Sequence, residues 1–127
     1  MKLVLDTSAY SAFMGGDRRV REALSEAEKI YVPAIVLGEL LAGFATGSRR
    51  VQNEQELREF LASSRVEVWP VTDETARRYA TVYAALRKKG RPIPTNDLWI
   101  AATVLEAGGL LVSLDAHFSE VEALPTY

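Results

Sequence analysis

The sequence contains no cysteine and a single histidine, His117, among its 127 residues. The absence of cysteine excludes disulfides, thiolate metal sites and cysteine nucleophiles. One histidine leaves almost no material for a zinc site built from nitrogen and sulfur ligands. A cysteine-free composition also fits a reducing compartment, so we expect a cytoplasmic protein.

Long hydrophobic runs and a strong charge bias are missing as well. No apolar stretch is long enough to cross a bilayer, because the most apolar one is interrupted by Glu39 and two glycines. The first residues lead directly into a strand-like run that contains Asp6, which is not a secretory pattern. The formal net charge of −2 gives no overall attraction to nucleic acid, so any such binding must come from local basic clusters. We expect no membrane partner.

Short apolar strands alternate with helical patterns along the whole chain. We predict strands near residues 2–6, 30–32, 66–71 and 110–114, separated by helices, with a short helical turn near 116–121. This alternation predicts one α/β domain over residues 1–127, with a central parallel sheet flanked by helices. The helix that follows Pro33 is apolar on nearly every side, which predicts that it is buried.

Four carboxylates stand where elements begin, end or are apolar. Asp6 and Asp115 close strand-like runs, Asp97 opens an apolar helix, and Glu39 is the only charged residue of its helix. Helix capping explains Asp6, Asp97 or Asp115 taken singly. Glu39 has no capping role, so it must pair with a buried arginine or bind a ligand. Because the carboxyl ends of parallel strands share one edge, the four together predict an oxygen site for Mg²⁺ or Mn²⁺.

Neutral oxygen atoms lie beside these carboxylates. Thr7 and Ser8 follow Asp6, and Asn96 precedes Asp97, so they could orient water or ligands or act as ordinary helix caps. Ser113, Asp115 and His117 contain the residue types of a catalytic triad. They are crowded into one short segment, however, and a triad needs three groups that converge in order. His117 is expected at the surface or at the edge of a pocket.

The basic residues form several clusters, and most such clusters are solvated faces. One of them leads directly into Asn96 and Asp97: it contains Arg87, Lys88, Lys89 and Arg91. A positive rim beside an acidic centre suits a phosphodiester substrate, so this cluster is a candidate RNA contact.

Four motifs in order resemble the PIN-domain ribonucleases. They are Val4-Leu5-Asp6-Thr7-Ser8, Gly38-Glu39-Leu40, Thr95-Asn96-Asp97-Leu98-Trp99-Ile100-Ala101-Ala102 and Leu111-Val112-Ser113-Leu114-Asp115-Ala116-His117-Phe118. The small size and the coverage of the whole chain look most like the VapC toxins of bacterial and archaeal toxin–antitoxin pairs.

The resemblance implies a three-layer α/β/α fold and Mg²⁺- or Mn²⁺-dependent cleavage of RNA by a metal-activated water. Asp6, Glu39, Asp97 and Asp115 would be the catalytic metal ligands. The implied partners are an RNA substrate, a small antitoxin that covers the active site, and a second copy in a homodimer. Ser113 stands where the family often has threonine and keeps the hydroxyl, so with Thr7, Ser8 and Asn96 it is expected to orient the metal ligands. Leu114 replaces a polar or basic residue and could alter substrate contact.

Two alternatives to a toxin endoribonuclease remain open at this point. One is a housekeeping PIN nuclease that processes RNA. The other is a non-catalytic binding module whose acidic pocket receives an arginine of a partner.

Overall fold

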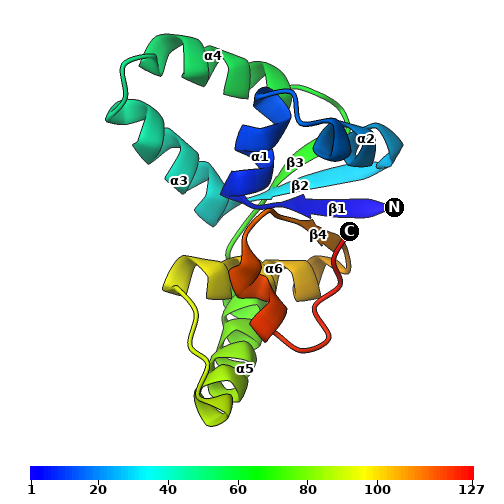
Figure 1. The fold of residues 1–127 in the computed structure, drawn as a ribbon, viewed down its shortest axis with the longest axis vertical. Helices are drawn as coiled ribbons and strands as arrows, with labels where there is room; N and C mark the ends of the chain where they lie inside the picture. The colour runs from blue at the N-terminus through cyan, green and yellow to red at the C-terminus, as the bar shows by residue number, and fades with distance from the viewer.

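A four-stranded, fully parallel sheet forms the centre of the computed structural model, which describes residues 1–127 (Figure 1). Its strands are β1 (Lys2–Leu5), β2 (Lys29–Pro33), β3 (Val66–Trp69) and β4 (Leu110–Val112). Their order in the sheet is β3-β2-β1-β4. The chain therefore moves outward from β1 through β2 to β3 and then returns to the opposite side of β1. Such a reversal creates a crevice at the carboxyl ends of the two strands that flank it, here β1 and β4.

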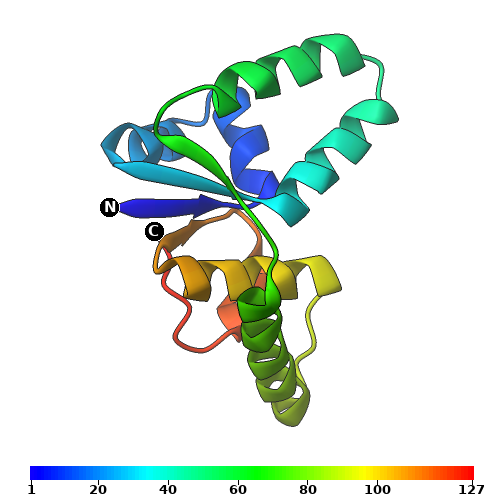
Figure 2. The same cartoon turned by 180° about the vertical axis from the view of Figure 1, so that it is seen from behind.

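Six α-helices and one 3-10 helix flank the sheet. They are α1 (Thr7–Met14), α2 (Arg18–Glu26), α3 (Ala34–Ala45), α4 (Arg50–Leu61), α5 (Asp73–Lys89), α6 (Thr95–Ala107) and η1 (Ala116–Glu120). The first four lie on one side of the sheet, and α5, α6 and η1 lie on the other (Figures 1 and 2). The three-layer α/β/α prediction is confirmed.

Strand β1 is buried on both faces, as a central parallel strand must be. Leu3 and Leu5 point into a core shared with α1 and α2, whereas Val4 points into a larger core shared with α5 and α6. This alternation follows from the two-residue period of a strand. The predicted strands 66–71 and 110–114 are too long at their C-terminal ends. Pro70, which has no N–H to donate, follows β3, and β4 already ends at Val112.

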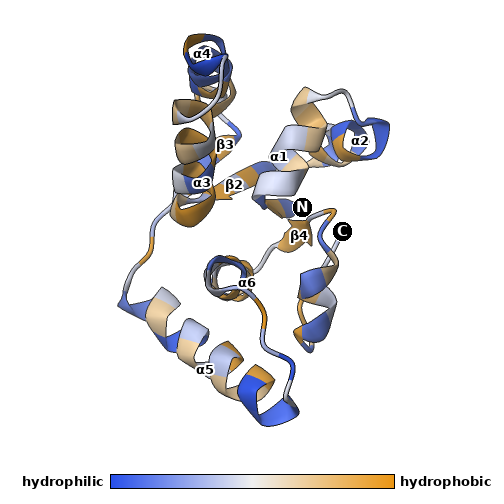
Figure 3. Ribbon diagram, turned by 60° about the vertical axis from the view of Figure 1, so that its left-hand side comes forward, coloured by the Kyte–Doolittle hydropathy of each residue, from blue (hydrophilic) through white to orange (hydrophobic).

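The prediction that the helix after Pro33 is buried is wrong for most of α3. Only Val36 and Leu40 are buried, and the side chain of Leu41 is 39% exposed. Helices α3 and α4 form an arm that projects from the sheet, and apolar residues run along α3 (Figures 1 and 3). Apolar sequence patterns occur in helices that are buried within their own chain and in helices that are buried by a second chain. The pattern alone therefore does not distinguish the two cases.

Glu106, in the last turn of α6, shows how this fold uses a half-buried carboxylate structurally. Its Oε1 accepts hydrogen bonds from Trp69 Nε1 at 3.0 Å and from Thr75 Oγ1 at 2.6 Å. Thr75 also closes the capping box at the start of α5. Glu106 therefore fixes the β3–α5 connection against α6, the helix that carries Asp97.

None of the helices combines the length and hydropathy that a membrane crossing requires.

Candidate active site

Asp6 lies at the centre of the carboxyl edge of the sheet, directly after β1. Its Oδ1 accepts hydrogen bonds from Ala9 N at 2.8 Å and from Ser8 Oγ at 2.7 Å, so it caps α1. Its other oxygen accepts a hydrogen bond from the Ser113 hydroxyl, across from β4. Asp6 is only 4% exposed, yet no cationic side chain pairs with it. It is thus both a helix cap and a buried acid at the crevice.

Glu39 joins this edge from α3. Its Oε1 accepts a hydrogen bond from Thr7 Oγ1 at 2.7 Å, and its Oε2 accepts one from Asn96 Nδ2 at 3.3 Å. Glu39 is half-buried, and neither of its partners is an arginine. The hydrogen bonds tie together the first turns of α1 and α6 and the middle of α3, three elements distant in sequence.

Asp97 and Asp115 come together around a third group, His117. His117 Nδ1 lies 2.9 Å from Asp97 Oδ2 and 3.0 Å from Asp115 Oδ1. Asp115 Oδ1 also accepts a hydrogen bond from His117 N at 2.9 Å and so caps η1. One ligand atom from each residue lies within 4.8 Å of the other two. This cluster is the arrangement in the chain best suited to hold a metal ion.

Neutral groups link the two halves of the site. The Ser113 hydroxyl donates to Asp6 and accepts from Asp115 N at 2.9 Å, and it lies 3.4 Å from Ser8 Oγ. Asn96 links Glu39 to the helix turn that carries Asp97. The neighbours predicted to orient the site, Thr7, Ser8, Asn96 and Ser113, therefore all contact the carboxylates or each other.

The electrostatics of Asp97 reflect this crowding. Burial raises the pKa of its carboxyl above the ordinary value, the negative charges of Asp115 and Glu39 raise it further, and the hydrogen bond to His117 opposes these effects. The same hydrogen bond raises the pKa of His117. Carboxylates that repel one another in a partly buried site are stabilised by a cation. The oxygen-rich donor set, with one imidazole nitrogen, fits a divalent ion such as Mg²⁺ or Mn²⁺.

His117 is the residue whose contacts the sequence alone did not reveal. It was expected at a pocket edge, and its side chain is indeed 51% exposed. Its position two residues after Asp115 was the available signal, because a tight turn there brings the ring back over the preceding carboxylate. The approach of Asp97 could not be read from spacing, since it comes from another helix.

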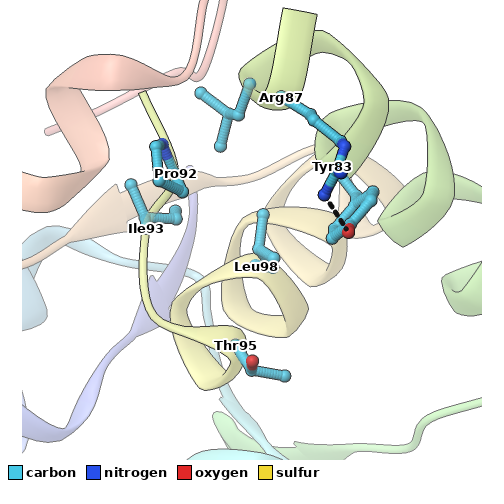
Figure 4. A pocket seen from close by; sticks show the side chains of 7 residues that line it. Tyr83, Arg87, Pro92, Ile93, Thr95 and Leu98 are labelled. Atoms are coloured by element: carbon cyan, nitrogen blue, oxygen red, sulfur yellow. Dashed lines mark hydrogen bonds between the residues drawn. The ribbon is translucent and has the colours of Figure 1, made fainter. Parts of the chain in front are cut away.

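The basic cluster lies at the end of α5 and just after it, and none of its side chains forms an ion pair with the four predicted site carboxylates. Lys89 Nζ donates to Glu120 O at 2.9 Å, and Lys89 and Arg91 pair with the Glu120 carboxylate at 3.6 and 4.0 Å. Arg87 Nη1 donates to Tyr83 Oη at 3.2 Å beside a mostly apolar pocket, which extends to Thr95 and Leu98 at the start of α6 (Figure 4). This pocket connects the basic cluster to the helix turn that carries Asp97.

Comparison with known proteins agrees with the architecture and the motifs. The family model described as PIN domain matches residues 3–124. The chain is 30% identical to "Ribonuclease VapC5" of Mycobacterium tuberculosis over 119 residues, which cover 94% of this chain and 87% of the relative. It is 32% identical to "Ribonuclease VapC1" of Rickettsia felis over 130 residues, covering 98% of this chain and 93% of the relative.

Solved structures of similar proteins share the fold. The structure of VapBC2 from Rickettsia felis, bound to a DNA fragment from its promoter, has a chain that matches with a TM-score of 0.86 and 27% identity, covering 100% of this chain and 98% of that one. The toxin–antitoxin structure VapBC-5 from Mycobacterium tuberculosis matches with a TM-score of 0.77 and 29% identity, covering 98% and 93%. Sequence motifs, sheet order and these likenesses agree, and the chain belongs to the PIN domain family.

Proposed function

We propose that this protein is an endoribonuclease that acts as the toxin of a toxin–antitoxin pair and depends on Mg²⁺ or Mn²⁺. The observation that carries the proposal is the convergence of Asp97 and Asp115 at the crevice where Asp6 and Glu39 are held by hydrogen bonds. Relatives named as VapC ribonucleases and structures named as VapBC complexes support the activity and the biological role.

Asp6, Glu39, Asp97 and Asp115 would hold the ion, directly or through water. A bound divalent ion would supply a Lewis acid that lowers the pKa of water and neutralises charge at the scissile phosphate. The chain supplies orientation: Thr7 and Asn96 fix both oxygens of Glu39, and Ser113 fixes Asp6. No protein nucleophile is required, which suits a chain without cysteine.

Brief expression in a bacterial host tests the proposed role. We expect growth arrest and newly cleaved cellular RNAs, both absent with Asp97→Asn and both suppressed by co-expression of the antitoxin. Cleavage of RNA precursors without growth arrest would favour a housekeeping nuclease. Arrest by the Asp97→Asn variant equal to that of the wild type would favour a binding module.

The basic cluster is proposed to contact RNA phosphates through Arg87, Lys88, Lys89 and Arg91. The ion pairs of Lys89 and Arg91 with Glu120 are exposed and at long distance, so RNA phosphates can compete for these side chains.

Leu114 lies in the loop after β4, close to the site, and is 59% exposed. It would offer the substrate an apolar contact rather than a charged one.

Replacing Lys88, Lys89 and Arg91 together with alanine should weaken RNA binding and flatten its salt dependence. Each lost phosphate contact reduces the slope of log affinity against log salt by roughly 0.7 for a single strand. Binding of a short RNA by the Asp97→Asn protein, measured between low and moderate salt, gives this slope. The matched control is Arg77→Ala with Arg78→Ala, which removes two exposed arginines from the same helix. If the slope equals that of the parent protein, the cluster is an ordinary solvated face and not an RNA contact.

The proposed homodimer would bury exposed apolar surface. Tyr79 stacks on Trp99 at a centroid distance of 4.2 Å and on Tyr83 at 6.2 Å, which forms an aromatic strip across α5 and α6. Tyr83 is 43% exposed at one end of the strip. A small antitoxin would cover the site and the apolar helix α3, whose Leu41 is also exposed.

Tyr83→Glu should convert the dimer into a monomer, because a charge placed in an apolar interface loses its hydration. Light scattering after size exclusion measures the mass, and Arg77→Glu on the same helix is the control. A dimer that survives Tyr83→Glu would place the interface elsewhere.

A further inference from the structure

His117 holds its ring against two of the four carboxylates in a way that capping and packing do not require. Its backbone N–H already satisfies the turn by donating to Asp115 Oδ1 at 2.9 Å. The ring is half exposed and contributes little to the core, yet Nδ1 lies 2.9 Å from Asp97 and 3.0 Å from Asp115. The side chain is therefore positioned by the site itself.

The two nitrogen–oxygen distances also match the spacing between adjacent ligand atoms of a metal ion. Octahedral Mg²⁺ holds its ligands at about 2.0–2.1 Å, so adjacent ligand atoms are separated by roughly 3 Å. His117 Nδ1 has this spacing to both Asp97 Oδ2 and Asp115 Oδ1. An ion placed among these three atoms would need little movement of the ring. A metal ligand must be the unprotonated nitrogen of a neutral imidazole, so coordination through Nδ1 would place the ring proton on Nε2.

The chemistry of an imidazole differs from that of the surrounding oxygens. Carboxylates suit Mg²⁺ and Mn²⁺, whereas imidazole nitrogen favours the first-row transition metals, in an affinity order that rises from Mn²⁺ to Cu²⁺. A site with oxygen ligands alone discriminates little between Mg²⁺ and Mn²⁺. One nitrogen ligand shifts the balance toward Mn²⁺.

We infer that His117 Nδ1 is a direct ligand of the divalent ion, beside Asp97 and Asp115, and that it makes this site select Mn²⁺ over Mg²⁺. The inference rests on the proposed function, since it assigns a further ligand to the same metal centre. It predicts a mixed nitrogen–oxygen coordination sphere. A role limited to a hydrogen bond with the two carboxylates would leave the sphere with oxygen only.

Electron paramagnetic resonance on the full chain loaded with Mn²⁺ tests this directly. Electron spin echo modulation should contain a nitrogen coupling in the wild type, and His117→Gln should lose it. Titration should give a Mn²⁺ affinity at least about tenfold weaker for His117→Gln, and competition with Mg²⁺ should give a nearly unchanged Mg²⁺ affinity. The Mn²⁺-to-Mg²⁺ preference should therefore fall about tenfold. Ser119→Ala, on the same 3-10 turn and bonded only to Ala116 O, is the matched control.

Two additional measurements keep the result interpretable. His117→Ala removes any ligand that the glutamine oxygen could supply and should behave like His117→Gln. Melting in chelator verifies that both variants fold. Mn²⁺ binding by the wild type without nitrogen coupling, or an unchanged metal preference in both variants, would overturn the role of His117 and leave the proposed nuclease intact. No Mn²⁺ binding by the wild type would overturn both.

Discussion

Asp97→Asn and Glu39→Gln are each expected to reduce RNA cleavage by about 1000-fold or more while leaving the fold intact. Removal of a single preorganised electrostatic group from an active site commonly costs about 100- to 1000-fold. Here each substitution would also weaken ion binding. Asp6→Asn should have an equally large effect, and it keeps the cap of α1, because asparagine caps helices as well as aspartate does.

The measurement is single-turnover cleavage of a labelled RNA, with circular dichroism to verify folding. Asp115→Asn should lose less activity, because an outer carboxylate can act through water. Glu106→Gln is the control: this half-buried carboxylate of α6 accepts hydrogen bonds only from Trp69 and Thr75. It should alter stability more than the cleavage rate. Wild-type cleavage by Asp97→Asn or Glu39→Gln would remove that residue from the site.

Addition of Mn²⁺ to the metal-free protein should raise its melting temperature by roughly 10 °C. An ion at a hundredfold excess over its dissociation constant stabilises the native state by about 2.7 kcal/mol. For a domain of this size, 1 kcal/mol corresponds to a few degrees. The gain should be largely lost in Asp97→Asn, which removes one of the proposed ligands.

In the presence of chelator, Asp97→Asn should melt at a higher temperature than the wild type. Burial and neighbouring carboxylates raise the pKa of Asp97 in the folded protein above its ordinary value, so the native state holds a proton that the unfolded chain releases. Ionisation of Asp97 therefore begins to lower the stability as pH rises through the pKa of the unfolded chain, and the loss is complete above the pKa of the folded protein. The difference in melting temperature between the two proteins should shrink as pH falls toward the pKa of the unfolded chain. If Asp97→Asn instead melts several degrees below the wild type in chelator at neutral pH, Asp97 is mainly a structural cap.

Much of the fold was predictable because short apolar strands and helical periods alternate without ambiguity. The strands predicted near residues 2–6 and 110–114 indicated two carboxyl ends that meet, and the observed register places Leu5 opposite Val112. That local pattern was sufficient to bring Asp6 and the Ser113–Asp115 segment to one edge. Asp6 and Asp115 cap α1 and η1 while they lie at this edge, so their capping role does not exclude the proposed role as metal ligands.

Three features were not predictable because they depend on tertiary contacts. The apolar pattern of α3 predicted burial, but the arm formed with α4 leaves Leu41 at the surface. The contact between His117 and Asp97 joins η1 to α6, and no sequence spacing encodes the distance between these elements. The partners of Glu39 were likewise found only in the structure, where a hydroxyl and an amide group, and no arginine, contact its carboxylate.

Cleavage of one defined RNA before and after metal removal tests the central claim most directly. The wild-type protein should cleave in Mn²⁺ or Mg²⁺, lose activity in chelator, and recover it when the ion is restored. Asp97→Asn should remain inactive under all three conditions. Equal cleavage by the wild type in chelator and in Mn²⁺, retained after repurification, would contradict a metal-dependent site built from these carboxylates.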